Sequence, residues 1–183
     1  MTEALDRFAM QKPTQIDRGS GTNPPVDHIN PIDRISLVDR INASQAGSLP
    51  GMLDFQWVEA DKGRVRGRFE IAAKHFSPHG LLHGATLVAL ADSACGFGCL
   101  ASLPEGATGF ATGELKTNFI GTVREGGVSC EARLVHAGRT TQVWDADIRS
   151  EATGKAVALF RCTQMLLYPP GDTAGRKASR EQS

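Results

Sequence analysis

The sequence has few aromatic side chains, no net charge and no paired cysteines. Phe, Trp and Tyr make up 6% of the 183 residues, and 20 Lys and Arg balance 20 Asp and Glu. A neutral chain lacks the basic surface with which most nucleic-acid-binding proteins contact phosphates, and it lacks the polybasic excess of membrane-surface proteins. We therefore expect no nucleic acid and no membrane among its partners, and no segment indicates a membrane span.

The cysteines also exclude a common class of site. Cys95, Cys99, Cys130 and Cys162 form no Cys-x-x-Cys pair and have no zinc-finger spacing with histidines. We expect four reduced, buried thiols and no metal. The N-terminal residues carry early acids and no apolar run, so we predict no signal peptide and a cytoplasmic location.

Composition divides the chain into one domain and two tails. Residues 1–31 and 169–183 contain prolines, glycines and scattered charges with little periodicity, which predicts flexible tails. Residues 32–168 form the candidate domain. With 20 glycines and few aromatic residues, its core should consist of Ala, Val, Leu and Ile with backbones close together.

The hydrophobic period changes along the domain. Apolar residues at intervals of three from Ile32 to Ile41 predict a helix, and the uniformly apolar run 84–103 predicts a long buried helix. Alternating or turn-bounded runs predict strands at 52–60, 64–71, 109–120, 127–136, 140–149 and 155–168. This order predicts an α+β fold in which one antiparallel sheet packs against a long helix.

Asp92 is the only carboxylate in the long helix. A buried carboxylate is costly unless it is paired or hydrogen-bonded, and Asp disfavours a helix interior. One interpretation is structural: Thr86, Ser93, a neighbouring strand or a second subunit satisfies the carboxylate. The other is functional: Asp92 faces a cleft and acts as a general base or a nucleophile.

The segment before this helix points to the functional interpretation. Glycines lie at the tight turn and at the helix entrance, where free backbone N–H groups can bind a developing oxyanion. His83 lies two and a half helical turns before Asp92, so the two side chains need not meet. Alone, His83 fits a helix-start residue bonded to the backbone better than a catalyst.

Two motifs resemble a known family. The run from Ser77 to Ala85, followed by Leu90-Ala91-Asp92-Ser93-Ala94, resembles the signature of hotdog-fold acyl-CoA thioesterases, with the phenylacetate-degradation type as the closest branch. The segments 103–106, 112–119, 136–140 and 154–158 are similar to the same family. The resemblance covers about residues 45–168. It implies a hotdog fold, in which the sheet wraps the long helix, and a homodimer with shared active sites that pairs into a dimer of dimers, a homotetramer.

The resemblance also implies roles for individual residues. The Gly84 N–H polarises the thioester carbonyl, Asp92 of the partner protomer acts as base or nucleophile, and Thr112 helps to hold the lytic water. His83 and Ser77 complete the catalytic set, with Ser77 in place of the usual Asn. The expected substrate-binding residues are His79, Asn118, Gly138, Arg139 and Thr140, of which the last three contact the nucleotide end of CoA. The substrate is an acyl-CoA, and no cofactor is implied because coenzyme A is part of the substrate.

Two other functions compete with hydrolysis. The run from His75 to Pro78 resembles the His-Phe-Pro of hotdog dehydratases, but those enzymes pair the His with a helix Glu, where this helix has Asp92. A second hydratase pattern needs a His at position 97, which is Phe. A non-catalytic acyl-CoA sensor would carry a helix-turn-helix, for which residues 1–31 are too short and irregular. We therefore predict a thioesterase acting on a small aromatic or medium-chain acyl-CoA, with the choice between CoA and acyl-carrier protein left open.

Overall fold

A computed structural model describes residues 36–169 of the chain. The predicted tails 1–31 and 169–183 lie outside this range apart from Pro169, so the domain limits stay predictions. The main elements are, in chain order, α2 (Leu37–Ser44), α3 (Leu49–Met52), β1 (Gln56–Asp61), β2 (Arg64–Glu70), α4 (Gly84–Ala101), β3 (Gly109–Phe119), β4 (Gly127–Ala137), β5 (Thr141–Ser150) and β6 (Ala156–Leu167).

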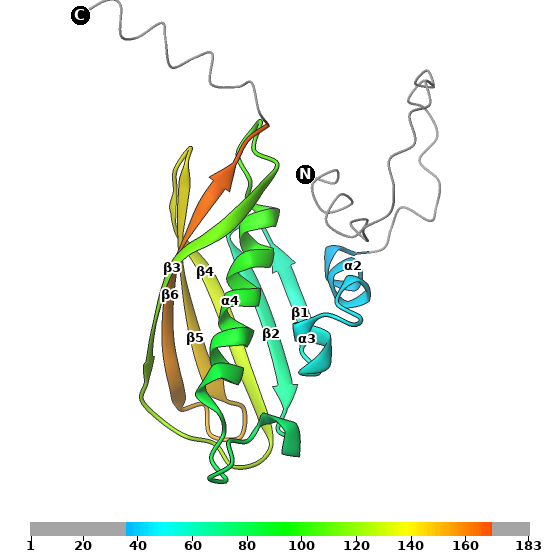
Figure 1. The fold of residues 1–183 in the computed structure, drawn as a ribbon, viewed down its shortest axis with the longest axis vertical. Coiled ribbons are helices and arrows are strands. Elements are labelled where there is room, and N and C mark those ends of the chain that lie inside the picture. Colours follow the sequence, from blue (N-terminus) through cyan, green and yellow to red (C-terminus); the bar gives the residue numbers. More distant parts are fainter. Residues whose placement is uncertain (1–35, 170–183) are drawn as a thin grey trace, which may run out of the picture.

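The six strands form one sheet in the order β1-β2-β4-β5-β6-β3, and every neighbouring pair is antiparallel. The sheet curves around α4, which crosses one of its faces (Figure 1). The predicted α+β architecture is confirmed. By length and composition α4 could cross a membrane, but 61% of it is buried inside the fold, as expected of a core helix.

Small residues let α4 lie close to the sheet. A Cβ on Gly98 of α4 would come within 2.5 Å of the Trp144 ring, and one on Gly67 of β2 within 2.6 Å of the Trp57 ring. These glycines are therefore needed for close packing around the two tryptophans. All four cysteines are free and buried in this core, as the sequence predicted.

The segment before β1 differs from the prediction. The predicted strand 52–60 begins only at Gln56, because residues Leu49–Met52 form the short helix α3 with a proline in its first turn. The preceding helix α2 is capped by Ser36, whose hydroxyl accepts the Asp39 N–H at 3.2 Å. Ile32, where this helix was predicted to begin, lies before the described residues.

A side-chain amide attaches α2 to the edge of the sheet. Asn42 donates to the Trp57 carbonyl at 2.9 Å and accepts the Trp57 N–H at 3.0 Å. The Asn42 side chain thus bonds to Trp57 as a neighbouring strand would. This pair fixes α2 and the connection to α3 beside α4.

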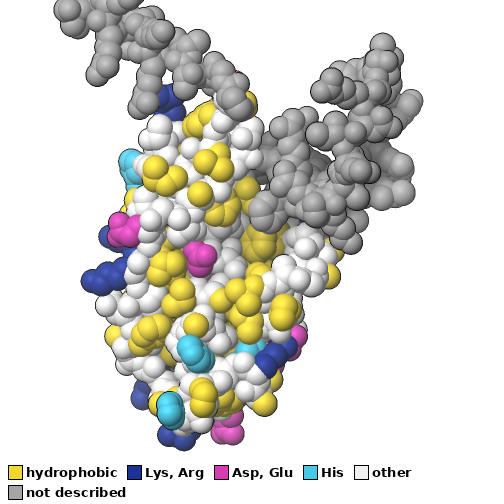
Figure 2. All heavy atoms as spheres, in the orientation of Figure 1, with side chains coloured by type: hydrophobic (Ala, Val, Ile, Leu, Met, Phe, Trp, Pro, Cys, Tyr) yellow, Lys and Arg dark blue, Asp and Glu magenta, His cyan; other side chains and the backbone are white. Residues whose placement is uncertain are grey.

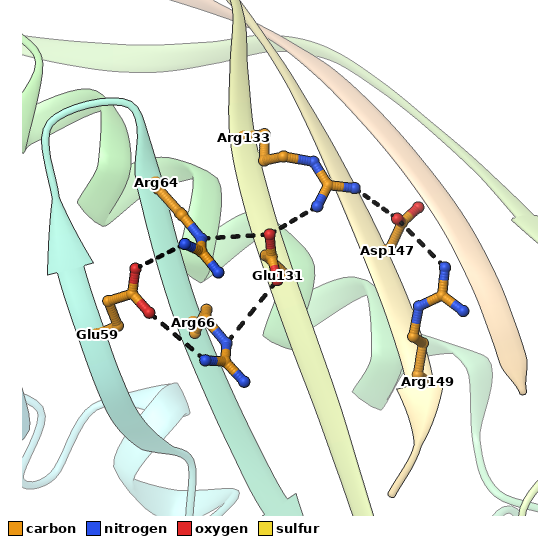
Figure 3. Close-up of polar contacts among 7 residues, drawn as sticks. All are labelled: Glu59, Arg64, Arg66, Glu131, Arg133, Asp147 and Arg149. Carbon is orange, nitrogen blue, oxygen red and sulfur yellow. Dashed lines mark hydrogen bonds and ion pairs between the residues drawn. The ribbon is translucent and has the colours of Figure 1, made fainter. Parts of the chain in front are cut away.

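The outer face of the sheet carries a network of ion pairs (Figure 3). At its centre, Glu131 of β4 accepts a hydrogen bond from Arg133 at 2.6 Å and forms ion pairs with Arg64 at 3.2 Å and with Arg66 at 3.8 Å. Glu59 pairs with both Arg64 and Arg66 on the neighbouring strand. The zero net charge of the chain thus includes many charges that are paired on the outer face.

We expect Glu131→Gln to lower the free energy of unfolding by about 1 kcal/mol at pH 7. Burial raises the pKa of Glu131, but hydrogen bonds from Arg133 and Arg64 outweigh burial and hold it below its ordinary value. Its contribution is therefore present above the unfolded-state pKa and is lost as the pH falls through the folded-state pKa. Urea unfolding should show a difference from wild type at pH 7 that shrinks below pH 4 and in high salt.

The matched control is Glu125→Gln in the loop before β4, because Glu125 makes no ion pair within residues 36–169. This control should leave stability unchanged at every pH. A Glu131→Gln effect that is equally large at pH 3 and pH 7 would show that packing, and not charge, is responsible.

Candidate active site

The long helix begins where the sequence predicted, at Gly84. His83 is its N-cap residue, and the His83 Nδ1 accepts the Ala85 N–H at 3.0 Å. The structure thus gives His83 the backbone-bonded role that its position indicated, and any part in the chemistry stays a prediction.

Gly84 leaves its backbone N–H available. No acceptor among residues 36–169 bonds to this N–H, which points out of the positive end of the helix. A Cβ at this position would lie 2.8 Å from Cζ of Phe119, so a glycine is needed for the Phe119 ring to pack here. The helix start can therefore donate a hydrogen bond to a carbonyl oxygen that becomes negatively charged.

Asp92 lies near the middle of α4 and is partly buried. Burial raises the pKa of its carboxyl group above the ordinary value, and a hydrogen bond from Thr112 opposes this shift. The Thr112 Oγ1 lies 3.2 Å from Asp92 Oδ1. A carboxylate with a raised pKa is a better general base near neutral pH than an ordinary one.

A β-bulge aims Thr112 at Asp92. Leu115 and Thr112 of β3 pair with Cys162 and Gln164, which are successive inward positions of β6, so β3 has one extra residue at Gly113. With regular alternation from Leu115, Thr112 would point to the outer face. The bulge instead turns it toward the helix, as bulges beside active sites often do.

A cavity of about 240 Å³ opens beside Asp92. Among the described residues that line it, Asp92 alone is charged. Gln45 is fixed in its wall, because it accepts from Trp57 Nε1 at 2.8 Å and donates to the Phe55 carbonyl at 2.6 Å. The other lining residues are Ser44, Ser48 and Pro50 from the α2–α3 segment, Ser93, Gly96, Phe97 and Leu100 from α4, and Phe110 from β3.

Ser77 and His79 lie in the loop that leads into α4. The Ser77 N–H donates to the Leu81 carbonyl at 2.8 Å, and Gly80 closes the turn with a φ of +73°. His79 is exposed, and neither its ring nor the Ser77 hydroxyl bonds to a described residue. One protomer therefore brings these two residues to the Gly84 end of the helix.

The remaining predicted binding residues lie elsewhere in the protomer. Asn118 pairs with Leu159, whose side chain is on the outer face, so Asn118 faces away from Asp92. The turn from Gly138 to Thr140 joins β4 to β5 near the C-terminal end of α4, where Gln142 donates to the Ser102 carbonyl at 2.8 Å. A single protomer does not bring this turn together with Gly84.

His75, the residue that suggested a dehydratase, is occupied. It is fully buried, its Nδ1 accepts the Ala72 N–H at 2.9 Å, and its Nε2 lies 3.0 Å from the Leu53 carbonyl. Both ring nitrogens are bonded to the backbone, so His75 is not free to move a proton to a substrate. Within the described range, no three His, Cys, Asp or Glu side chains converge as metal ligands.

Several residues that line the cavity were not predicted from the sequence. No motif marks Phe97, Phe110 or Gln45 as part of a site. Gln164, whose Oε1 lies 3.0 Å from Thr112 Oγ1, does stand out in the pattern of its strand. It stands in the inward register of β6 between Cys162 and Leu166, where a buried amide is out of pattern.

The comparisons with known proteins agree with this geometry. The sequence model of the thioesterase superfamily matches residues 79–157. The 1,4-dihydroxy-2-naphthoyl-CoA hydrolase of Listeria monocytogenes is 33% identical over 106 residues, which cover 58% of this chain and 85% of that relative. The chain therefore belongs to the thioesterase superfamily and is a thioester hydrolase.

Solved structures show the same fold. A mutant of the thioesterase PA1618 from Pseudomonas aeruginosa has a TM-score of 0.68 at 27% identity and covers 72% of this chain and 94% of its own. The smu.793 protein of Streptococcus mutans, bound to acetyl CoA, has a TM-score of 0.57 at 25% identity over 62% and 89% of the two chains. The predicted hotdog fold is confirmed, whereas the phenylacetate-degradation branch stays a prediction.

Proposed function

We propose that this protein is an acyl-CoA thioesterase that hydrolyses a small aromatic or medium-chain acyl-CoA to the free acid and coenzyme A. The observation that carries the proposal is the position of Asp92, a carboxylate with a raised pKa at the edge of a largely apolar cavity. Two similar proteins support CoA thioesters as substrates, since one is a 1,4-dihydroxy-2-naphthoyl-CoA hydrolase and the other is bound to acetyl CoA.

In the proposed reaction, the Gly84 N–H bonds to the thioester carbonyl oxygen. Asp92 takes a proton from water, whose oxygen attacks the carbonyl carbon. The carbonyl oxygen becomes negative in the tetrahedral intermediate, where the hydrogen bond from Gly84 strengthens. Collapse of the intermediate breaks the carbon–sulfur bond, and the CoA sulfur leaves as a thiolate that takes up a proton. Asp92 can also attack directly, and that alternative stays open.

Two protomers are needed for this chemistry. Asp92 lies eight residues after Gly84 in the same helix, so a rise of 1.5 Å per residue separates them by about 12 Å along the axis. A base and an oxyanion donor must both lie about 3 Å from one thioester group. A two-fold axis that passes α4 near Val88 would bring each Gly84 beside the partner's Asp92.

The surface of the protomer supports such a pairing. β3 is an 11-residue edge strand with exposed apolar side chains, including Leu115 and Phe119. A long apolar edge of this kind invites pairing with another chain. The α4 face carries mainly hydrophobic and uncharged side chains, with Lys and Arg at its margins (Figure 2). We infer a homodimer with shared sites, and we keep the pairing into a tetramer, the cytoplasmic location and CoA contacts by Arg139 as predictions.

The size and the lining of the cavity suggest which acyl group it binds. An apolar cavity of about 150 Å³ accommodates benzene, so a cavity of about 240 Å³ has room for a substituted ring or a medium-length chain. The rings of Phe97 and Phe110 offer flat walls, and the hydroxyls of Ser44, Ser48 and Ser93 can bond to polar substituents.

A panel of acyl-CoA and acyl-carrier-protein thioesters with a free-thiol readout tests this function. The variant Gly96→Ala tests whether the cavity binds the acyl group. A Cβ on Gly96 would lie 2.9 Å from Phe110 Cζ, so the ring must move and reshape the cavity. We expect kcat/KM for aromatic acyl-CoAs to fall about tenfold and that for acetyl-CoA to change little.

The matched control is Gly109→Ala on β3, where the nearest atom to the added Cβ is 4.0 Å away and the residue does not line the cavity. Its kcat/KM should stay at the wild-type level for every substrate. Hydration of crotonyl-CoA without any release of thiol from the panel would sink the proposal in favour of a hydratase.

A further inference from the structure

The Thr112 hydroxyl lies between two oxygen atoms. It is 3.2 Å from Asp92 Oδ1 and 3.0 Å from Oε1 of Gln164. Gln164 is fully buried, and its Nε2 lies 3.3 Å from the sulfur of Cys162. The bulge at Gly113 creates this arrangement, because it places Thr112 opposite Gln164 on the inward side of the sheet.

A single hydroxyl proton cannot serve both oxygens. A threonine hydroxyl donates one hydrogen bond, and an ionised carboxylate can only accept. When Asp92 is ionised and Gln164 presents Oε1 to Thr112, the hydroxyl can donate to only one of the two oxygens. The other oxygen then faces the Thr112 oxygen, and both of these atoms are acceptors. In a buried site such an unsatisfied contact is costly.

Two arrangements satisfy every group, and they run in opposite directions. With protonated Asp92, the carboxyl donates to Thr112, Thr112 donates to Gln164 Oε1, and the amide donates to the Cys162 sulfur. With ionised Asp92, a half-turn of the amide lets Gln164 Nε2 donate to Thr112, which then donates to the carboxylate. The Cys162 thiol can donate weakly to the amide oxygen in this second arrangement.

Among residues 36–169, no charged side chain of a neighbouring element competes for the hydrogen bonds of Asp92, Thr112 and Gln164. The groups that face Asp92 among the described residues carry no formal charge at neutral pH, and burial raises the pKa of the Cys95 thiol well above its ordinary value. They are Cys95 and Ser93 on α4, Thr112 on β3, and Gln45 and Ser48 from the α2–α3 segment. The direction of the hydrogen bonds therefore follows the protonation state of Asp92, and the Gln164 amide turns to match it.

We propose that Gln164 is a positioning residue that acts on Asp92 through Thr112, turning its amide so that the Thr112 hydroxyl stays bonded to Asp92 in both protonation states. The inference rests on the proposed function insofar as it takes Asp92 to be the base. It assigns a role to a residue that never touches the substrate. In the ionised state the amide orients the hydroxyl toward a charged acceptor, where hydrogen bonds are strongest.

A double-mutant cycle tests the proposal. We expect Gln164→Met and Thr112→Val each to lower kcat about tenfold, with KM nearly unchanged, because the carboxylate loses the bond that fixes its position. Each should also raise the pKa of the acidic limb of the kcat profile by about one pH unit, since the ionised form loses more than the protonated form.

The combination of the two variants is decisive. If Gln164 acts only through Thr112, the double variant matches Thr112→Val alone in kcat and in the acidic limb. Thr112→Ser keeps the hydroxyl, so adding Gln164→Met to Thr112→Ser should again lower kcat. Additive losses in the double variant would overturn the proposal, because a merely structural amide would act without the hydroxyl. Gln164→Leu carries the same expectation should Gln164→Met fail to fold.

A measurement without substrate separates this inference from the proposed function. Carbon-13 NMR of the Asp92 carboxyl should show a pKa that is higher in Gln164→Met than in the wild type, by the same amount as in the kcat profile. The double variant should have the same Asp92 pKa as Thr112→Val alone. That result stands even if none of the panel thioesters is hydrolysed. If the wild type hydrolyses thioesters but Gln164→Met does not change the titration of Asp92, the proposed function stands. The positioning role of Gln164 is then refuted. Thr163→Val, on the outer side of β6, is the control and should alter neither readout.

Discussion

Asp92→Asn is expected to lower kcat for thioester hydrolysis by about 10³-fold while the fold and the oligomer survive. The amide keeps the shape of the carboxyl group but cannot accept a proton from water. Thiol release measures the loss, and circular dichroism and size-exclusion chromatography measure fold and assembly. A folded Asp92→Ala protein with near wild-type turnover would refute the assignment.

The raised pKa of Asp92 predicts how activity and stability change with pH. Because burial raises the pKa of Asp92, wild-type activity should fall on acidification at a pH above the ordinary carboxyl pKa. The same shift means that Asp92 favours the folded state below its unfolded-state pKa, and that this contribution is lost as the pH rises through the folded-state pKa. Asp92→Asn should therefore be at least as stable as wild type at pH 8.

The control is Asp145→Asn, which removes a carboxylate from the outer face. Asp145 pairs with Arg161 there and does not line the cavity. Its turnover should remain at the wild-type level. Equal losses in both aspartate variants would point to a general effect of charge removal on the fold.

An equal mixture of two inactive variants, Gly84→Pro and Asp92→Asn, should recover about a quarter of wild-type activity once subunits exchange. Gly84 is the first residue of α4, a position that accepts proline, and His83 before it is already extended. Gly84→Pro therefore removes the N–H with little change to the helix, and we expect a loss of about 10²–10³-fold in kcat. Random mixing with Asp92→Asn gives half mixed dimers, each with one intact site.

Gly84→Ala is the control for the added side-chain atoms. It places a Cβ against Phe119, which is 54% exposed and can yield, but it retains the N–H. Its loss should be well below that of Gly84→Pro. If each protomer held a complete site, the mixture would be no more active than its two parents, and the shared site would be disproved.

The fold was predictable because local patterns dominate it. The run 84–103 predicted a helix that extends from Gly84 to Ala101, and the turn glycines bounded the strands within a few residues. The exception was Leu49–Met52, a short helix for which the sequence predicts no helix. Pro50 can end one helix or lie in the first turn of another, and only packing against α4 decides between the two.

The site was harder to predict because its geometry depends on register. The motif around Gly84 and the acid at Asp92 stand out in the sequence, but the inward turn of Thr112 results from one extra residue in β3. A bulge depends on the pairing of two distant strands, so alternation within β3 alone gives the wrong face. Gln164 becomes visible only once the inward register of β6 is known.

The cavity is lined by two parts of the chain that lie apart in the sequence. Ser44, Gln45, Ser48 and Pro50 lie before residues 79–157, the part matched by the superfamily, whereas Asp92 and Gly84 lie within it. Under the proposed function, the residues that contact the acyl group are thus partly separate in sequence from those that act on the thioester bond. Exchanging residues 44–50 between related enzymes is therefore a route to new substrate preference that leaves the catalytic groups untouched.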